Sequence, residues 1–504
     1  MSENMTAAVA ANSNGATFFG HPRGLVTLFF TEMWERFSYY GMRALLVLFL
    51  VDAIEHHGFG LTDRTATAIY GLYTAGVYLT SLPGGWIADR LLGSQRAVWW
   101  GALVIMLGHT LLGLAVTPAT FYLGLVVVAC GTGLLKPNIG AIVAELYPEG
   151  GGRRDAGYTI YYFSVNLGAT IGQIVTAWLA TRISWSAGFF AAAVGMALGL
   201  LQFALLRKHL GVAGVEPYRS ANNAALPILA RRAWIAAVVA GVVIALILFG
   251  AIPFDPLTVA HYSAGVIIAL AAAVFLYLLG FAGLDGLGRK RIAVIVVLFA
   301  ASAVFWAGFE QAGSSFNLFA DRYTNRVVET IQFEIPAGWF QSVNTFLILF
   351  CAPLFAALWQ WLSDRNRDWS AATKMALGLL LLGAGFVVMS GAARNVATGA
   401  KVAPTWLVAT YLLHTFGELC LSPVGQSAFS KLVPQRLVGQ IMGLWFLSIS
   451  LGSLLAGLIA GTFDSQNLNA MSGQYLNIVW LVVIPGIVLI LLARPLKKLA
   501  GGVN

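Results

Sequence analysis

The stretch Gly84-Gly85-Trp86-Ile87-Ala88-Asp89-Arg90 follows one apolar segment of the chain, and Trp361-Leu362-Ser363-Asp364-Arg365-Asn366-Arg367 follows another. Each stretch places an Asp-Arg pair after the second of six consecutive apolar segments. Two further apolar segments lie between the two runs of six. The repeated pair therefore predicts two related halves of six helices each, with a two-helix hairpin inserted between them.

The apolar segments have the length of membrane-spanning helices, because about 20 apolar residues cross the hydrocarbon core of a bilayer. Unpaired backbone amides are too costly in lipid for an open sheet, and the segments lack the polar–apolar alternation of a membrane barrel. We therefore predict an all-α integral membrane protein with 14 transmembrane helices. They lie near 24–51, 66–88, 97–116, 119–144, 157–181, 187–206, 233–252, 262–284, 292–319, 338–361, 373–392, 403–430, 437–462 and 474–494.

The composition excludes a soluble enzyme. Of the 504 residues, 59% are hydrophobic and only 10% are charged, against about 25% charged in soluble domains, and the mean hydropathy is +0.79. Intrinsic disorder is excluded on the same grounds. Cys130, Cys351 and Cys420 lie inside apolar runs without metal-ligand spacing, so we interpret them as buried apolar side chains.

The distribution of basic residues predicts the orientation in the membrane. Most loop Arg and Lys residues lie in alternate loops and the C-terminal tail, for example in Arg289-Lys290-Arg291, whereas the opposite loops hold few, such as Arg182. Because positive residues mark the cytoplasmic side, both termini are predicted to be cytoplasmic. The net charge of +9 then reflects topology and not a nucleic-acid partner.

These segments and loops define the predicted domains. We interpret the inserted hairpin as structural, because its apolar cores hold no charged residue. The domains are a cytoplasmic N-terminal tail at 1–22, an N-terminal six-helix bundle at 23–208, a linker with the hairpin at 209–291, a C-terminal six-helix bundle at 292–494 and a cytoplasmic C-terminal tail at 495–504.

Seven charged residues lie within the predicted membrane helices. A charge at the centre of a bilayer costs roughly 2.5–3.5 kcal/mol even on the lenient insertion scale. The four charged residues in the first helix share one polar stripe with Tyr39 and Tyr40 at helical spacing. We therefore expect them to face a water-filled cavity or partner charges. The structural alternative is a buried set of ion pairs that only holds the helices together. The seven are Glu32, Glu35, Arg36, Arg43, Lys136, Glu310 and Glu418.

The charges divide unevenly between the two halves. The first half holds the cations Arg36, Arg43 and Lys136, and the second half presents the carboxylates Glu310 and Glu418, with Asn344 as an amide. A lysine beside two carboxylates makes a proton switch, since protonation of a carboxylate cancels its attraction for the lysine. The polarity suits a zwitterion, such as a free peptide, with its anionic end toward the first half.

The motif Glu32-x-x-Glu35-Arg36-Phe37-x-Tyr39-Tyr40 resembles the E-x-x-E-R-F/Y-x-Y-Y signature of the proton-dependent oligopeptide transporter family, and the Asp-Arg loop resembles the G-x-x-x-D-R signature of the major facilitator superfamily. Residues 133–138, 158–168 and 417–423 are also similar to that family. The resemblance runs from about residue 20 to 495. It implies a major facilitator fold in a bacterial inner membrane, because the inserted hairpin is typical of bacterial members.

The resemblance also implies roles for individual residues. It implies that the proton-coupling residues are Glu32, Glu35, Arg36, Lys136 and Glu310. It implies that the substrate-binding residues are Arg43, Lys136, Tyr40 and Tyr78 at the peptide carboxylate, Asn166, Asn344 and Glu418 at the amino terminus, Glu310 as the second proton site, and Trp306 and Trp445 along the cavity. The His that animal members carry in the second helix is missing here, so proton coupling is expected to rest on carboxylates.

The expected function is a proton-coupled symporter that imports di- and tripeptides by alternating access, with salt-bridge switching between carboxylates and Lys136. The alternatives are a carrier of another small anion or zwitterion in the same family and, less favoured, a drug antiporter of the same fold. The expected partners are the peptide, protons and the lipid bilayer, and the functional unit is a monomer. We expect no enzyme activity, nucleic acid, metal or cofactor, and no ATP, because residues 150–154 lack the Gly-Lys-Ser/Thr of a phosphate loop.

Overall fold

The computed structural model describes residues 17–18, 20–115, 117–148, 151–217, 226–365, 367, 369–463 and 467–502. Residues 1–16 and 19 of the predicted N-terminal tail lie outside the described residues. So do residues 218–225 of the predicted linker, Asn366 of the second Asp-Arg loop, and residues 503–504 of the predicted C-terminal tail.

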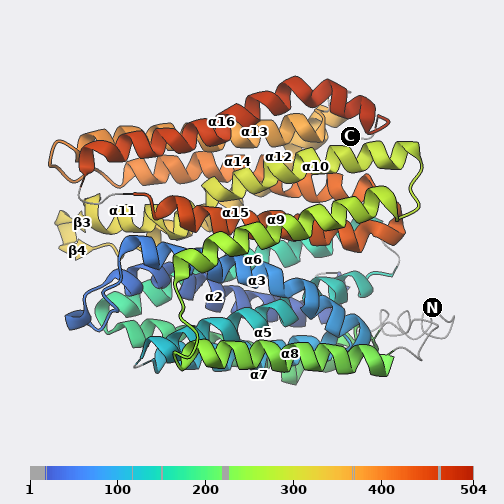
Figure 1. The fold of residues 1–504 in the computed structure, drawn as a ribbon, viewed down its shortest axis with the longest axis horizontal. Helices are drawn as coiled ribbons and strands as arrows, with labels where there is room; N and C mark the ends of the chain where they lie inside the picture. Colours follow the sequence, from blue (N-terminus) through green and yellow to red (C-terminus); the bar gives the residue numbers. More distant parts are fainter. Residues whose placement is uncertain are drawn as a thin grey trace. The chain divides into compact units, whose positions relative to one another are not determined.

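Fourteen helices of 20 residues or more are present in this described part of the chain, which confirms the predicted all-α architecture (Figure 1). Their order follows the order of the predicted segments. They are α2 (Gly24–Val51), α3 (Asp63–Ile87), α4 (Ser94–Gly113), α5 (Pro118–Glu145), α6 (Gly151–Arg182), α7 (Trp185–Leu206), α8 (Leu226–Leu248), α9 (Pro256–Gly280), α10 (Gly286–Phe309), α12 (Trp339–Asp364), α13 (Ala371–Val396), α14 (Thr405–Lys431), α15 (Val438–Ala460) and α16 (Leu468–Leu499).

Twelve helical segments are long and apolar enough to cross a membrane by length and composition, among the described residues. Helices α2 and α3 are not in this set although they have 28 and 25 residues. In α2 the reason is its charged stripe, which lowers the mean hydropathy of the segment. The lower hydropathy of α2 thus comes from the same residues that the sequence singles out as functional.

The predicted helix at 292–319 is wrong in one respect, because it is not continuous. Helix α10 ends at Phe309, a 3-10 turn spans Glu310–Gly313, and the short helix α11 spans Ser315–Tyr323. A Cβ atom on Gly313 would lie 2.5 Å from Cζ of Tyr70, so only glycine permits this approach. Irregular backbone at membrane depth is tolerated where it is buried in protein, and Glu310 is 2% exposed.

Two small antiparallel hairpins complete the described structure, β1 (Thr17–Phe18) with β2 (His21–Pro22) and β3 (Val327–Val328) with β4 (Phe333–Glu334). A π-helical turn spans Ala88–Leu92 and carries the first Asp-Arg pair. Single 3-10 turns span Ile54–His56, Arg207–Leu210, Glu329–Ile331 and Gln435–Leu437.

The chain divides into two compact units. Unit 1 comprises Met1–Leu45 and Leu79–Asp255, and in it α4 packs against α5 and α7. Unit 2 comprises Leu46–Tyr78 and Pro256–Asn504, and in it α13 lies beside α14 and α16 (Figure 1). The predicted domain boundaries at 208 and 291, drawn along the chain, stay a prediction.

The first two-thirds of α3 pack with the C-terminal helices of unit 2. A Cβ atom on Gly71 would lie 3.1 Å from Cα of Gly457, so the two backbones touch. Ser450 donates a hydrogen bond from Oγ to the carbonyl oxygen of Ala75 at 2.9 Å. Small residues at a helix interface allow such close packing in membrane proteins.

Candidate functional site

Three charged residues of α2 form a buried ion network in unit 1. Arg36 Nε lies 3.0 Å from Glu32 Oε1, one helical turn away, and Arg36 also pairs with Glu35. Glu32, Glu35 and Arg36 are at most 3% exposed. Because buried charges are stable only when they are paired, the three residues form one ion-paired cluster; their role in proton coupling stays a prediction.

Backbone contact between α2 and α6 holds this network in place. A Cβ atom on Gly41 would lie 2.6 Å from Cγ2 of Thr176, which leaves no room for a larger residue. Thr176 donates from Oγ1 to the carbonyl oxygens of Gly41 and Gly172, both at 2.9 Å. The glycines therefore set the distance between the charged stripe of α2 and the polar residues of α6.

Side chains from α5 and α6 extend the network. The positive charge of Lys136 on α5 acts on Glu35, and Tyr161 on α6 shares a hydrogen bond with Glu32. Next to Lys136, Pro137 cannot donate a backbone hydrogen bond, and Asn138 donates from Nδ2 to the carbonyl oxygen of Leu134 at 2.6 Å. Lys136 is therefore close enough for its charge to act on Glu35, and its part in proton coupling stays a prediction.

The predicted carboxylate-binding side of unit 1 contains an arginine over an aromatic ring. The guanidinium carbon of Arg43 lies 5.5 Å from the ring centroid of Tyr40, and that of Arg36 lies 5.5 Å from the centroid of Tyr39. Asn166 on α6 is 4% exposed and donates from Nδ2 to the carbonyl oxygen of Tyr162 at 3.0 Å. Its role at the peptide amino terminus stays a prediction.

Glu310 has a partner from a distant part of the chain within unit 2. Tyr70 on α3 donates from its hydroxyl to Glu310 Oε2 at 3.0 Å. The adjacent Gln311 donates to the carbonyl oxygen of Ala456 on α15 at 3.0 Å and accepts from Ser315 Oγ at 2.7 Å. The 3-10 turn that carries Glu310 is therefore tied to α3, α11 and α15.

A second carboxylate site lies between α12 and α14. Asn344 donates from Nδ2 to Glu418 Oε2 at 3.1 Å and is also 3.0 Å from Thr415 Oγ1. Glu418 and Asn344 are half-buried, whereas Thr415 is fully buried. The structure thus brings together Asn344 and Glu418, two of the three residues that the resemblance assigns to the peptide amino terminus.

The aromatic residues assigned to the cavity pack against neighbouring side chains. Trp306 is 7% exposed and contacts Phe309 edge-on. Trp445 is fully buried and packs edge-on against Phe429. Tyr78 stacks on Phe446. That these side chains line a substrate cavity stays a prediction.

The sequence reasoning missed three partners of the predicted residues. They are Tyr161, Tyr70 and Thr415, which contact Glu32, Glu310 and Asn344. Tyr70 and Tyr161 belong to groups of tyrosines at helical spacing on the second and fifth predicted helices, and this spacing could have identified them as candidates. Within the described residues, no group of three or more His, Cys, Asp and Glu side chains is placed to hold a metal ion.

A bundle of membrane-length helices with ion pairs and carboxylates buried in its spans has the construction of a secondary transporter. Residues 95–476 match the family model described as the POT family. The chain belongs to the POT family, the proton-dependent oligopeptide transporter family. It is therefore a multi-pass membrane transport protein of the major facilitator type and not an enzyme.

Individual relatives agree with this assignment over nearly their whole length. The chain is 41% identical to the peptide transporter YePEPT of Yersinia enterocolitica over 96% of both chains. It is 33% identical to the di-/tripeptide transporter of Lactococcus lactis subsp. cremoris over 98% of this chain and 99% of the relative. A crystal structure of a peptide transporter POT in complex with sulfate aligns with a TM-score of 0.91 and 36% identity, covering 99% of both chains.

Proposed function

We propose that the protein is a proton-coupled symporter that imports di- and tripeptides. The observation that carries the proposal is the buried network of Glu32, Glu35 and Arg36, on which the charge of Lys136 acts. The proposal also follows the names of the relatives, which are peptide and di-/tripeptide transporters.

The network works as a switch in this proposal. When Glu35 or Glu32 takes up a proton, the carboxylate loses its attraction for Arg36 and for Lys136. Lys136 then turns to the carboxylate of the peptide, with Arg43 and Tyr40 beside it. Each pKa unit of such coupling corresponds to about 1.4 kcal/mol.

Unit 2 receives the ammonium end of the peptide in this proposal. Glu418, held by Asn344, offers a carboxylate to the amino terminus, and Asn166 of unit 1 contributes its amide. Glu310, which accepts a hydrogen bond from the Tyr70 hydroxyl, is the second proton site in this proposal. A zwitterion with this polarity is what a free peptide presents.

Alternating access then requires that one end of the pathway closes while the other opens. Arg322 at the end of α11 pairs with Asp63 at the start of α3 through two hydrogen bonds of 2.6 and 2.7 Å. With both termini in the cytoplasm, this pair lies at the extracellular end. We propose that the pair stabilises this end of unit 2 during the cycle.

The membrane potential drives transport only through the proton, because a zwitterion carries no net charge. One proton crossing 100 mV supplies about 2.3 kcal/mol, and one pH unit adds about 1.4 kcal/mol. Together they support a several-hundred-fold accumulation of peptide at about 1.4 kcal/mol per decade. We propose that the monomer is sufficient for this cycle.

Uptake of a labelled dialanine peptide by proteoliposomes tests the proposal. We expect accumulation with an acidic exterior, and only equilibration after an uncoupler collapses the gradient. Lys136→Ala and Glu310→Gln are expected to abolish accumulation, whereas Lys208→Ala, at an exposed lysine outside the site, keeps it. Accumulation that ignores the pH gradient would contradict the proposal.

The alternative within the family is a carrier of another small anion or zwitterion, for which competition against dialanine uptake is the test. The cations Arg36, Arg43 and Lys136 disfavour a drug antiporter, since they repel cationic substrates. We therefore keep the peptide as the proposed substrate.

A further inference from the structure

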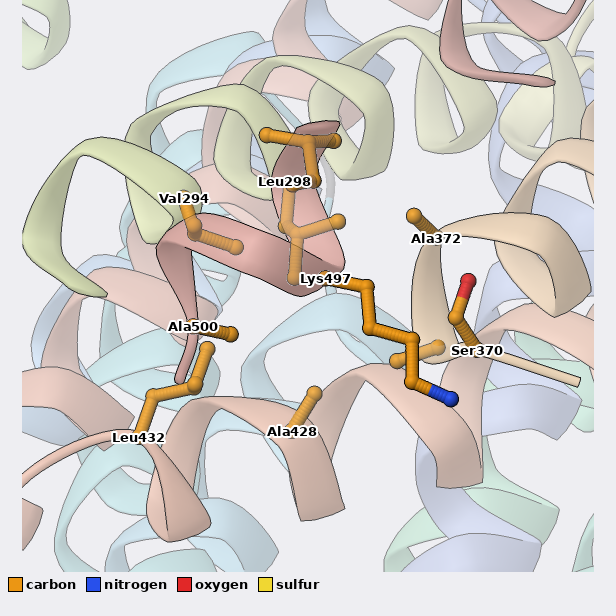
Figure 2. Close-up of a pocket in the computed structure, with 10 residues that line it drawn as sticks. Val294, Leu298, Ser370, Ala372, Ala428, Leu432, Lys497 and Ala500 are labelled. Atoms are coloured by element: carbon orange, nitrogen blue, oxygen red, sulfur yellow. The ribbon is translucent and has the colours of Figure 1, made fainter. Parts of the chain in front are cut away.

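A crevice in unit 2 lies at the end of the helices where the chain terminates. Four helices form it, at the start of α10 and α13 and at the end of α14 and α16 (Figure 2). Leu298, Ala372, Ala428 and Leu496 give it buried, apolar walls. Its cavity volume is about 30 Å³, so the crevice itself holds only a small part of a ligand.

The crevice continues onto an apolar surface that faces outward from unit 2. Val488 and Leu492 on α16 are 46% and 37% exposed and lie two turns and one turn before the crevice-lining Leu496. Exposed leucine on a membrane-spanning helix is covered by lipid. A hydrocarbon chain that lies along α16 can therefore enter the crevice without crossing a polar surface.

The mouth of the crevice is basic. Lys497 lines it, and Figure 2 shows the side chain of Lys497 extending toward the wall that carries Ser370. Arg291 donates from Nε to the carbonyl oxygen of Ala500 at 3.1 Å, which places a guanidinium beside this crevice-lining residue. The acid at the start of α10, Asp285, accepts from the Gly288 N–H as the helix cap.

The start of α13 adds to this positive potential. Ser370 is the N-cap residue of α13, and Ala371 and Ala372 are its first helical residues; all three line the crevice. The positive end of the helix dipole and the first-turn N–H groups therefore face the same side as Lys497.

We propose that this crevice binds an anionic phospholipid of the phosphatidylglycerol class. The phosphodiester lies between Lys497 and the start of α13, and one acyl chain follows the apolar wall and the outer face of α16. A lipid fits better than a free phosphate ion, because the walls below the lysine offer carbon and not hydrogen-bond donors. Basic pockets at helix ends recognise anionic headgroups in this way.

The test compares lipids and two neighbouring lysines in the purified full-length protein. The thermal unfolding midpoint is measured in mixed micelles with rising phosphatidylglycerol, with phosphatidylcholine as the neutral reference. Native mass spectrometry counts the bound lipids. Lys497→Gln removes the crevice lysine, and Lys498→Gln is the matched control, because Lys498 is also exposed but does not line the crevice.

We expect phosphatidylglycerol to raise the midpoint more than phosphatidylcholine and to remain bound in the mass spectrum. Lys497→Gln should weaken the apparent phosphatidylglycerol affinity roughly fivefold, while Lys498→Gln should keep most of it. Equal effects of the two lipids, or equal losses in both variants, would overturn the proposal. So would the same stabilisation by inorganic phosphate alone, because it would assign the site to a soluble anion.

Discussion

Tyr70 and Glu310 are hydrogen-bonded across unit 2 although 240 positions separate them in the chain. The bond joins α3 to the turn at which the predicted span at 292–319 is interrupted. We predict that Tyr70→Phe keeps the fold but lowers proton-driven peptide uptake by about tenfold, because a buried hydrogen bond to a charged group contributes about 1.5–3 kcal/mol. Proteoliposome assays measure the loss of uptake, and thermal unfolding measures whether the fold is kept. Tyr73→Phe, one turn along α3, is the control, and equal losses in both variants would argue against a specific role.

Glu35→Gln removes a charge that the proposed switch requires. We expect this variant, and Glu32→Gln, to retain counterflow exchange of peptide longer than concentrative uptake, because binding survives when proton linkage is lost. The two assays are run on the same proteoliposomes. Parallel loss of exchange and uptake would instead assign the carboxylates to binding or folding.

Gly41→Val tests the contact that positions this network. The new side chain would collide with Thr176, so α2 and α6 must move apart, and we expect the unfolding midpoint and uptake to fall together. Overpacking of this kind costs typically 1–3 kcal/mol. Gly241→Val on α8, where nothing lies within 4 Å, serves as the reference; a midpoint for Gly41→Val equal to that reference would refute the packing argument.

The Asp63–Arg322 pair gives a double-mutant cycle. Both side chains are only partly exposed, and the pair is bidentate, so we expect a coupling of about 1 kcal/mol between Asp63→Asn and Arg322→Gln. The double variant should therefore unfold at a higher temperature than the sum of the single losses implies. Strict additivity of the two single losses would mean that the pair contributes nothing to the stability of the folded protein.

The environment of Asp89, in the first Asp-Arg loop, leads us to expect that the free energy of unfolding depends on pH. Burial raises the pKa of Asp89, and the charge of Arg90 opposes this only in part. Since the folded state then holds the proton more tightly than the unfolded chain, the stabilisation is present at low pH and is lost as the pH rises through the folded pKa. Asp89→Asn should gain stability relative to the parent protein between pH 4 and pH 7, as measured by thermal unfolding. A difference between the unfolding midpoints of the two proteins that does not change with pH would contradict this prediction.

The sequence predicted most of the fold, because membrane-length apolar segments and local spacing are properties of short stretches. The pairing of Glu32 with Arg36 could also be predicted from a short stretch of sequence, because residues four apart share one helix face. The hydrogen-bond partners of Glu310 and Asn344 could not be predicted from any single segment of the sequence. Tyr70 and Thr415 reach them only through tertiary packing, and the break at Glu310 depends on the close approach of Tyr70 to Gly313.

The interruption of the span at 292–319 also has a mechanical consequence. A continuous helix would behave as one stiff rod, but α10 and α11 are two rods with a joint between them, and a 3-10 stretch within a helix often marks such a joint. Glu310 is the first residue of the 3-10 turn between the two helices. A change in the contacts of Glu310 would therefore act at the point where the two helical segments meet.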